Sequence, residues 1–318
     1  MPEAPRVLAP EAYRRGVAFF FDTNVCIDIE DAANGKTNDA SKARLTALIA
    51  RIATLNAEIV PAFGLLERAL DAEKSVLNRE RYDKEALSFP SKWARVERMC
   101  LGVNGPDRSV TLPEADFAAT VAHMTGKVRP IFASFLKIFQ IQEANPTALP
   151  IEKLRQYLDW AINDLDCIAV FAAQTAIAFF ADDSDAIRML GFKKKGPYKG
   201  AWGAAYDSLL LAFAHQLHFT TVADRPFVIF VTNDRAAAMI MRRCRVFGAI
   251  TDGPSIVTTV NQMDLEFPSY PDLRPIEPLL DTIKRRATVP RETPPERMEM
   301  VIQGLLSEVE RLWQAPVK

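Results

Sequence analysis

Four acidic residues stand beside apolar segments, where clustered carboxylates can carry out metal chemistry: Asp22, Glu67, Asp207 and Asp234. Carboxylates without histidine or cysteine partners offer hard oxygen ligands, which suit Mg²⁺ or Mn²⁺ rather than Zn²⁺. Because four carboxylates packed together repel each other strongly, a cation is nearly required to hold them. The sequence therefore predicts a divalent metal site built from these four residues.

Two of these acids follow short apolar runs of the kind that form buried strands. Asp22 follows the run VAFFF at 17–21, and Asp234 follows FVIFVTN. Such runs are typical of parallel strands that are covered on both faces. Since open α/β sheets bind ligands at the carboxyl ends of their strands, we expect Asp22 and Asp234 to lie at one sheet edge. Two helices can bring Glu67 and Asp207 over that edge.

The remaining sequence alternates helix and strand signals at first and then becomes mainly helical. Apolar residues at three- and four-residue spacing predict an amphipathic helix over 40–56, followed by a short strand and the helix of Glu67. Prolines and glycines punctuate a helical insertion at about 85–190, and a proline-rich segment precedes a last helix at 295–313. We therefore expect an α/β domain over 15–270 that contains this insertion, and a C-terminal helical extension over 271–318.

The charge balance and the cysteine count indicate which partners the protein can bind and in which compartment it works. Lysine and arginine number 39 against 40 aspartates and glutamates, so the net charge is -1. A polyanion must then be bound by a local basic cluster rather than by the field of the whole chain. The four cysteines are far apart, which argues against a disulfide framework and favours the reduced cytoplasm. No apolar stretch is long enough to cross a bilayer, so we expect no membrane partner.

The acidic motifs resemble those of the PIN-domain nucleases. FFFDTNVCIDI is similar to the family's first strand and its Asp-Thr-Asn, and EIVPAFGLLERA is similar to its second strand and glutamate helix. AYDSLLLAFA resembles its third acidic helix, and VIFVTNDRAAAMI followed by FGAI resembles its closing strand and helix. The resemblance covers about 15–85 and 200–255. It implies a three-layer α/β/α fold with a central parallel sheet.

The same resemblance implies a function and a role for each motif residue. It implies a nuclease that uses Mg²⁺ or Mn²⁺ to hydrolyse RNA, or less often DNA, leaving a 5′-phosphate and a 3′-hydroxyl. Asp22 and Asp234 would be inner metal ligands, Asp207 would complete the site, and Glu67 would bind directly or through water. The residues that would orient carboxylates and waters are Thr23, Asn24, Thr232 and Asn233.

One spacing departs from the compact members of the family. Asp207 and Asp234 are 27 residues apart, which requires an extended connection. Asp166 lies 16 residues before Asp182, a spacing that resembles the compact pattern, but ADDSD lacks the Thr-x-Asp turn. We favour Asp207 as the third ligand and keep Asp164 and Asp166 as additional candidates.

Two basic clusters flank the acids and can supply the local positive charge. They predict contacts to substrate phosphates by Lys193, Lys194, Lys195, Lys199 and Arg235. Single-stranded or structured RNA is the expected substrate, with DNA as an alternative. The long helical segments also leave room for a homo-oligomer contact or a regulatory protein partner. Toxin–antitoxin systems, RNA processing and phage defence all remain open as the physiological setting.

Two other classes of function compete with the nuclease. Aspartate after the first strand and threonine after FVIFV resemble the haloacid-dehalogenase phosphatases, but that group needs a second aspartate where this chain has Asn24. A non-catalytic PIN-like scaffold or RNA-binding module is the other alternative. Retention of four mutually repelling carboxylates argues against the scaffold.

Overall fold

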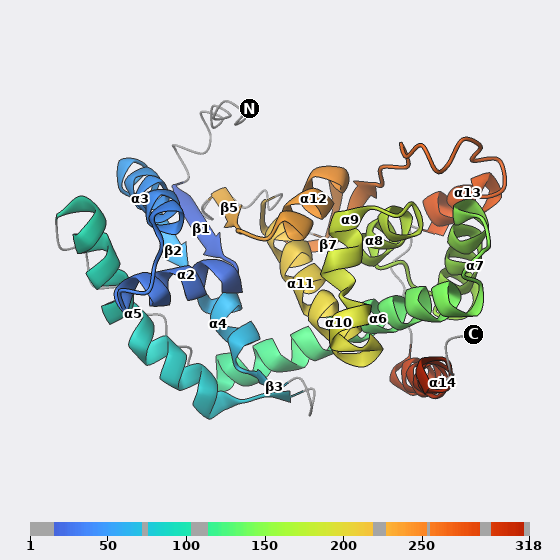
Figure 1. Ribbon diagram of the computed structural model, residues 1–318, viewed down its shortest axis with the longest axis horizontal. Coiled ribbons are helices and arrows are strands. Elements are labelled where there is room, and N and C mark those ends of the chain that lie inside the picture. The colour runs from blue at the N-terminus through green and yellow to red at the C-terminus, as the bar shows by residue number, and fades with distance from the viewer. Residues whose placement is uncertain are drawn as a thin grey trace. The chain divides into compact units, whose positions relative to one another are not determined.

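The computed structural model of the chain describes residues 16–71, 76–102, 114–218, 227–252, 255–286 and 294–314 (Figure 1). The chain forms two compact units. Unit 1 consists of Met1–Ala119 and Phe213–Asp234, and unit 2 consists of Thr120–Ala212 and Arg235–Lys318. The domain limits expected from the sequence, 15–270 and 271–318, stay predictions beside this division.

Unit 1 contains a small parallel sheet and the helices that follow its strands. Its elements are β1 (Val17–Phe21), α2 (Thr23–Ala33), α3 (Asp39–Thr54), β2 (Glu58–Val60), α4 (Ala62–Arg68), β3 (Leu70–Asp71), β4 (Val76–Leu77), α5 (Arg79–Leu101), the first turns of α6 (Glu114–Ala144) and β5 (Phe227–Val231). The strand and helix predicted around 17–21 and 40–56 are thereby confirmed.

Strand β1 is the centre of a three-stranded sheet with the order β2-β1-β5. Both neighbours run parallel to it, and Phe19 is in register with Ile59 of β2 and with Ile229 of β5. Val17, Phe19 and Phe21 of β1 are buried, as a parallel strand covered on both faces requires. An α/β arrangement with a parallel sheet is therefore present in unit 1.

Helices α2 and α4 pack against β1, and α3 and α5 pack in turn against α2. Helix α3 buries Leu45, Ile49 and Ile52, which recur at the spacing of one helical face. The ring of Trp93 on α5 lies 5.6 Å from that of Phe21 at the end of β1. The carboxyl end of β1 is consequently fixed by a packed core, and Asp22 begins where this core ends.

Unit 2 is mainly helical. It contains most of α6, then α7 (Pro150–Asn163), α8 (Val170–Phe180), α9 (Ser184–Leu190), α10 (Phe192–Lys195), most of α11 (Pro197–His218), α12 (Arg235–Arg243), β6 (Arg245–Asp252), β7 (Ser255–Gln262), α13 (Glu277–Arg286) and α14 (Pro295–Gln314). The described residues of the segment expected to be a helical insertion, 85–190, are accordingly mostly helical.

The strand predicted at VFGAIT forms, but it does not join the parallel sheet. Strand β6 pairs antiparallel with β7 in a separate two-stranded sheet. In the described part of the chain, the sheet at the candidate site therefore has three strands. The sequence pattern predicted the strand itself but not its partner. That partner is β7, the next strand along the chain.

The last helix contacts α6 at two points within unit 2. Glu299 of α14 forms an ion pair with Arg129, and the ring of Trp313 lies 5.9 Å from that of Phe139. Arg297 donates to the carbonyl oxygens of Asn163 and Asp164, which satisfies carbonyl groups at the end of α7. No helix in the described ranges combines the length and apolarity that crossing a membrane requires.

Candidate acidic site at the sheet edge

Asp22 occupies the end of β1 and the N-cap of α2. Its backbone N–H extends the sheet by donating to the carbonyl of Val231, at 3.0 Å, so the residue is held between two strands. Its side chain accepts from the backbone N–H of Thr23 at 2.7 Å, as an acidic cap at a helix N-terminus does. Only 6% of Asp22 is exposed, which is unusual for a charged residue.

The residues after β5 meet Asp22 through a threonine. The Thr232 hydroxyl donates to Asp22 Oδ2 at 2.5 Å and accepts from the backbone N–H of Asp234 at 2.9 Å. Asn24 Nδ2 also donates to Asp22 Oδ2, at 3.3 Å. The carboxylate of Asp22 and the backbone of Asp234 are thus connected through one hydroxyl group.

Burial and charge act together on Asp22. Burial raises the pKa of this carboxyl above its usual value, and repulsion from Asp234 adds to the increase. Hydrogen bonds from Thr232, Thr23 and Asn24 act in the opposite direction without cancelling it. The ionised form of Asp22 is therefore costly here, and a cation beside both carboxylates would relieve that cost.

Glu67 reaches the site through Thr23. The Thr23 hydroxyl donates to Glu67 Oε2 and lies 3.0 Å from the carbonyl oxygen of Gly64, so α4 and the start of α2 are tied together. A Cβ atom on Gly64 would lie 2.9 Å from the carbonyl oxygen of Phe21 and 2.9 Å from Cys26 Sγ. Only glycine allows α4 to approach the end of β1 this closely.

An ion-pair network next to Glu67 holds the same helices. Arg68 contacts Glu30 of α2 at 2.5 Å and Glu85 of α5 at 3.1 Å. Lys92 of α5 contacts the same two glutamates at 3.1 and 3.7 Å. Burial alone would raise the pKa of Glu30, but hydrogen bonds from Arg68 and Lys92 lower it overall. The network therefore stabilises the ionised form of Glu30 and links α2, α4 and α5.

Asp28 is a further carboxylate near the loop that carries Asp234. It lies on α2, accepts from Asn233 Nδ2, and has the guanidinium of Arg44 at 3.9 Å. Burial raises the pKa of Asp28, while Arg44 lowers it in part. Sequence reasoning missed Asp28, Gly64 and Arg68. The one signal available for Asp28 was its position four residues after the Asp-Thr-Asn motif, within the segment FFFDTNVCIDI.

Unit 1 thus brings together three of the four predicted acids and all four predicted supporting residues. Thr232 links Asp22 to the backbone of Asp234, and Thr23 links Glu67 to the start of α2. Asn24 donates to Asp22, and Asn233 donates to Asp28. Asp207, by contrast, lies on α11 within unit 2 and is partly buried. Its place as a third ligand stays a prediction.

The alternative acids also lie in unit 2. Asp164 is the C-cap of α7, and Asp166 follows it with a positive φ of 53°. Asp183 caps α9 by accepting from the backbone N–H groups of Asp185 and Ala186 at 2.9 and 3.1 Å. Asp183 therefore performs the capping role that its sequence context favours.

The predicted substrate-binding cations are exposed residues of unit 2. Lys193, Lys194 and Lys195 lie on α10, and Lys199 lies in the first turn of α11. Arg235 begins α12, has a side chain 79% exposed, and lies 4.0 Å from Asp185. Such exposure suits contact with a polyanion, because these charges keep most of their hydration until a partner binds.

The donors at the sheet edge fit a hard divalent cation better than a soft one. Across the described residues, no three histidine, cysteine, aspartate or glutamate side chains form a metal-binding group. Mg²⁺ commonly takes one or two carboxylates and completes its shell with water and substrate phosphate oxygens. Asp22 and Asp234 provide such a pair, and both hydroxyl and amide groups surround them.

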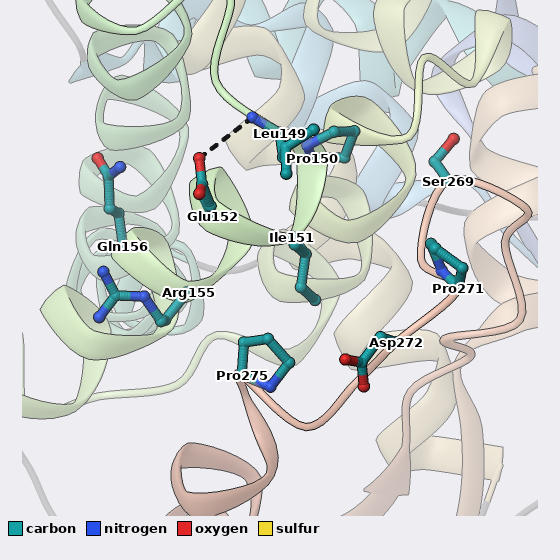
Figure 2. A pocket seen from close by; sticks show the side chains of 10 residues that line it. All are labelled: Leu149, Pro150, Ile151, Glu152, Arg155, Gln156, Ser269, Pro271, Asp272 and Pro275. Carbon is teal, nitrogen blue, oxygen red and sulfur yellow. Dashed lines mark hydrogen bonds between the residues drawn. The ribbon is translucent and has the colours of Figure 1, made fainter.

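A pocket elsewhere in the molecule includes none of the predicted site residues. Figure 2 shows it between the first turns of α7 and the segment 269–275, both in unit 2, with a volume of about 720 Å³. Its lining is largely apolar, with Leu149, Pro150 and Ile151 on one side. Its carboxylates already have partners within the protein: Glu152 accepts from the backbone N–H of Leu149 at 3.3 Å, and Asp272 pairs with Arg274.

Comparison of the chain with models of protein families, with curated proteins and with solved structures gave no match. The function must therefore be argued from the geometry of the sheet edge.

Proposed function

We propose that the chain is a divalent-metal-dependent nuclease, most simply an endoribonuclease, with a PIN-like α/β/α arrangement around its parallel sheet. One observation carries the proposal. Asp22 and Asp234 follow adjacent parallel strands, and the hydroxyl of Thr232 joins the Asp22 carboxylate to the backbone N–H of Asp234. This is the edge at which α/β sheets bind ligands, and the electrostatic cost of the pair favours a cation.

The protein residues have distinct roles in this proposal. Asp22 and Asp234 would hold Mg²⁺ or Mn²⁺, which when bound lowers the pKa of a water molecule and neutralises charge on phosphate oxygens. Thr232 and Asn24 orient the Asp22 carboxylate by donating to Oδ2. Glu67, fixed by Thr23, would hold a water or bind the ion from the side of α4. Asp207 is the proposed third ligand.

Binding of the nucleic acid is proposed for the exposed cations already described. Lys193, Lys194, Lys195 and Lys199 would contact the phosphate backbone, together with Arg235. Trp202, three residues after Lys199, is not proposed to stack on bases, because it is buried with its ring 4.7 Å from that of Phe132. We therefore expect affinity to depend on salt more than on base sequence.

The phosphatase alternative lacks a general acid at the position where that reaction needs one. In that reaction, the residue two positions after the first aspartate acts as general acid. Here that residue is Asn24, whose amide donates to Asp22 and does not titrate at physiological pH. The observation favours a phosphodiesterase in which Asp22 serves as a metal ligand.

The proposal is tested by cleavage of labelled single-stranded RNA and DNA in EDTA, Mg²⁺ or Mn²⁺. We expect cutting with Mg²⁺ or Mn²⁺ and none with EDTA. Asp22→Asn, Asp234→Asn and Asp207→Asn should abolish it, whereas Asp166→Asn should retain it. If Asp166→Asn lost cleavage and Asp207→Asn retained it, Asp166 rather than Asp207 would be the third ligand. If the protein cut neither RNA nor DNA in the presence of a metal ion, the nuclease proposal would be overturned and the non-catalytic scaffold would be the remaining alternative.

A further inference from the structure

We propose that Asp28 is a positioning residue that fixes the loop Thr232–Asp234, and with it the carboxylate of Asp234, through its hydrogen bond with Asn233. The inference rests on the proposed function for its catalytic consequence. It assigns a role to a carboxylate that no motif in the sequence singles out.

The loop after β5 has two side-chain attachments to the segment that starts α2. Thr232 donates to Asp22 at the beginning of the helix, and Asn233 donates to Asp28 six residues later. Consecutive loop residues are therefore bound at two separated points of one rigid element. Together with the bond from the Asp22 N–H to the Val231 carbonyl, these two points restrict the direction of the loop more than the bond from Thr232 alone would.

The attachment determines the backbone position of Asp234. The backbone N–H of Asp234 donates to the Thr232 hydroxyl, so residues 232–234 form a short turn at the sheet edge that is closed by a hydrogen bond. If Asn233 were released, this short hydrogen-bonded segment would lose one of its anchors. Asp234 would then spend less time at the distance from Asp22 that a shared cation requires.

Asp28 is in turn held in place by its own surroundings. Its side chain is about one-fifth exposed and lies 3.9 Å from Arg44 of α3. Arg44 also donates to Ser41 Oγ, at 2.8 Å, which limits the motion of the guanidinium. Through these contacts α3 supports α2, and α2 supports the loop. A negatively charged acceptor at this place makes the bond from Asn233 stronger than one between neutral groups.

The test compares four variants: Asp28→Ala, Asp28→Asn, Asn233→Ala and, as the control, Asp31→Ala. Asp31 is an acid on the same helix that repels Asp28 electrostatically, but among the described residues its side chain has no hydrogen bond to the loop. Asparagine at position 28 keeps an acceptor and should restore most of the function that alanine removes. Each variant is measured for metal-dependent RNA cleavage, for Mn²⁺ affinity and for amide hydrogen exchange in peptides covering 227–240.

We expect Asp28→Ala and Asn233→Ala each to lower cleavage and Mn²⁺ affinity about 10- to 100-fold, as loss of a ligand's supporting partner does. Their combination should be no worse than either alone. Exchange at 232–234 should rise in both and stay unchanged in Asp31→Ala. Unchanged exchange in Asp28→Ala would overturn the inference, as would equal cleavage by Asp28→Ala and Asp31→Ala.

The failure of the proposed function is distinguishable from the failure of this inference. A wild-type protein that neither cleaves RNA nor binds Mn²⁺ removes the proposed function, whatever the variants do. Faster exchange at 232–234 in Asp28→Ala would still establish that Asp28 fixes the loop, because that readout needs no activity.

Discussion

At the scale of single residues, Asp22 combines deep burial with a charge. Burial and repulsion from Asp234 both raise the pKa of this carboxyl, so neither favours its charged form in the free protein. Groups that reduce stability without a bound ligand are common at functional sites. Stability and ligand binding at Asp22 should therefore change in opposite directions when the charge is removed.

This opposition gives a prediction for Asp22→Asn. The pKa of Asp22 is higher in the folded state than in the unfolded state, whose value is 3.8. Above pH 3.8 the folded state therefore binds more protons than the unfolded state, and the free energy of unfolding falls as pH rises. At pH 7 the variant should melt higher than wild type, by ~2 °C in a chain of this length. Saturating Mg²⁺ should raise the Tm of wild type and leave that of Asp22→Asn unchanged. A variant less stable than wild type in EDTA would contradict the argument.

Gly64 offers a second prediction, based on space rather than charge. A Cβ atom there would lie 2.9 Å from the carbonyl oxygen of Phe21, and backbone atoms cannot move aside cheaply. Gly64→Ala should therefore reduce the free energy of unfolding in urea by about 1–3 kcal/mol. It should also lower cleavage, because α4 carries Glu67.

The matched control for this substitution is Gly304→Ala. Gly304 lies within α14, and a Cβ atom there would meet nothing within 4 Å. Alanine is the better helix former, so this change should add about 0.5–1 kcal/mol. Equal effects of the two alanines in urea unfolding would show that α4 does not need its close approach to β1.

At the scale of elements, the ion pairs of Arg68, Lys92, Glu30 and Glu85 join three helices of unit 1. The four side chains are about one-fifth exposed, so water screens them less than it screens a surface pair. The helices they join carry Thr23, Glu67 and Trp93. The network therefore stabilises the arrangement that brings α4 to the sheet edge.

Arg68→Met tests this network, since methionine keeps the apolar stem and removes the charge. We expect a loss of about 1–3 kcal/mol at pH 7, because two glutamates lose a charged partner. The folded-state pKa of Glu30 is lowered, so its contribution is present above pH 4.5 and disappears as pH falls through the folded value. The difference between variant and wild type in urea unfolding should accordingly shrink in acid.

Arg274→Met is the control for Arg68→Met. Arg274 pairs with Asp272 at a site where its side chain is 82% exposed. We expect the urea midpoint of Arg274→Met to match that of wild type at every pH. A comparable loss in both variants would mean that the partial burial of the network is irrelevant.

The sequence predicted those elements whose pattern is local. The run VAFFF and the spacing of Leu45, Ile49 and Ile52 depend only on burial of one segment, and β1 and α3 form as expected. Placement of Asp22 and Asp234 at one sheet edge followed from the same logic. Asp28 was missed because its partner, Asn233, is 205 residues away.

Other features could not be predicted because they depend on tertiary approach. Nothing in the sequence around Gly64 predicts that the end of β1 packs against this residue. The division into two units was equally hidden, since it falls within the continuous helices α6 and α11 and directly after Asp234. Periodicity predicts that a helix forms, but it does not predict where a long helix passes from one unit to the next.

At the scale of the whole molecule, each unit contains a buried thiol that reports on its own core. Cys26 lies in unit 1 and Cys244 in unit 2, and each is 1% exposed. Burial raises the pKa of Cys26 strongly and that of Cys244 to about 12. Since the thiolate is the reactive form, both should resist alkylation in the folded protein.

We therefore expect thiol labelling to distinguish folded from unfolded protein in both units. At pH 8, Cys26 and Cys244 should react about 100-fold more slowly in the native chain than in urea. Cys100, which is partly exposed, serves as the internal reference and should react sooner. Mass spectrometry of the labelled peptides assigns each rate. Rapid native labelling of Cys26 would contradict the packing of the core under Asp22.

The central claim is that Asp22 and Asp234 together bind a divalent cation. Calorimetric titration of Mn²⁺ into the wild-type protein, Asp22→Asn, Asp234→Asn and the control Asp31→Asn tests it most directly. We expect saturable binding by wild type and by Asp31→Asn, and its loss in the other two variants. Saturable binding that survives in both Asp22→Asn and Asp234→Asn, or no binding by wild type, would contradict the account.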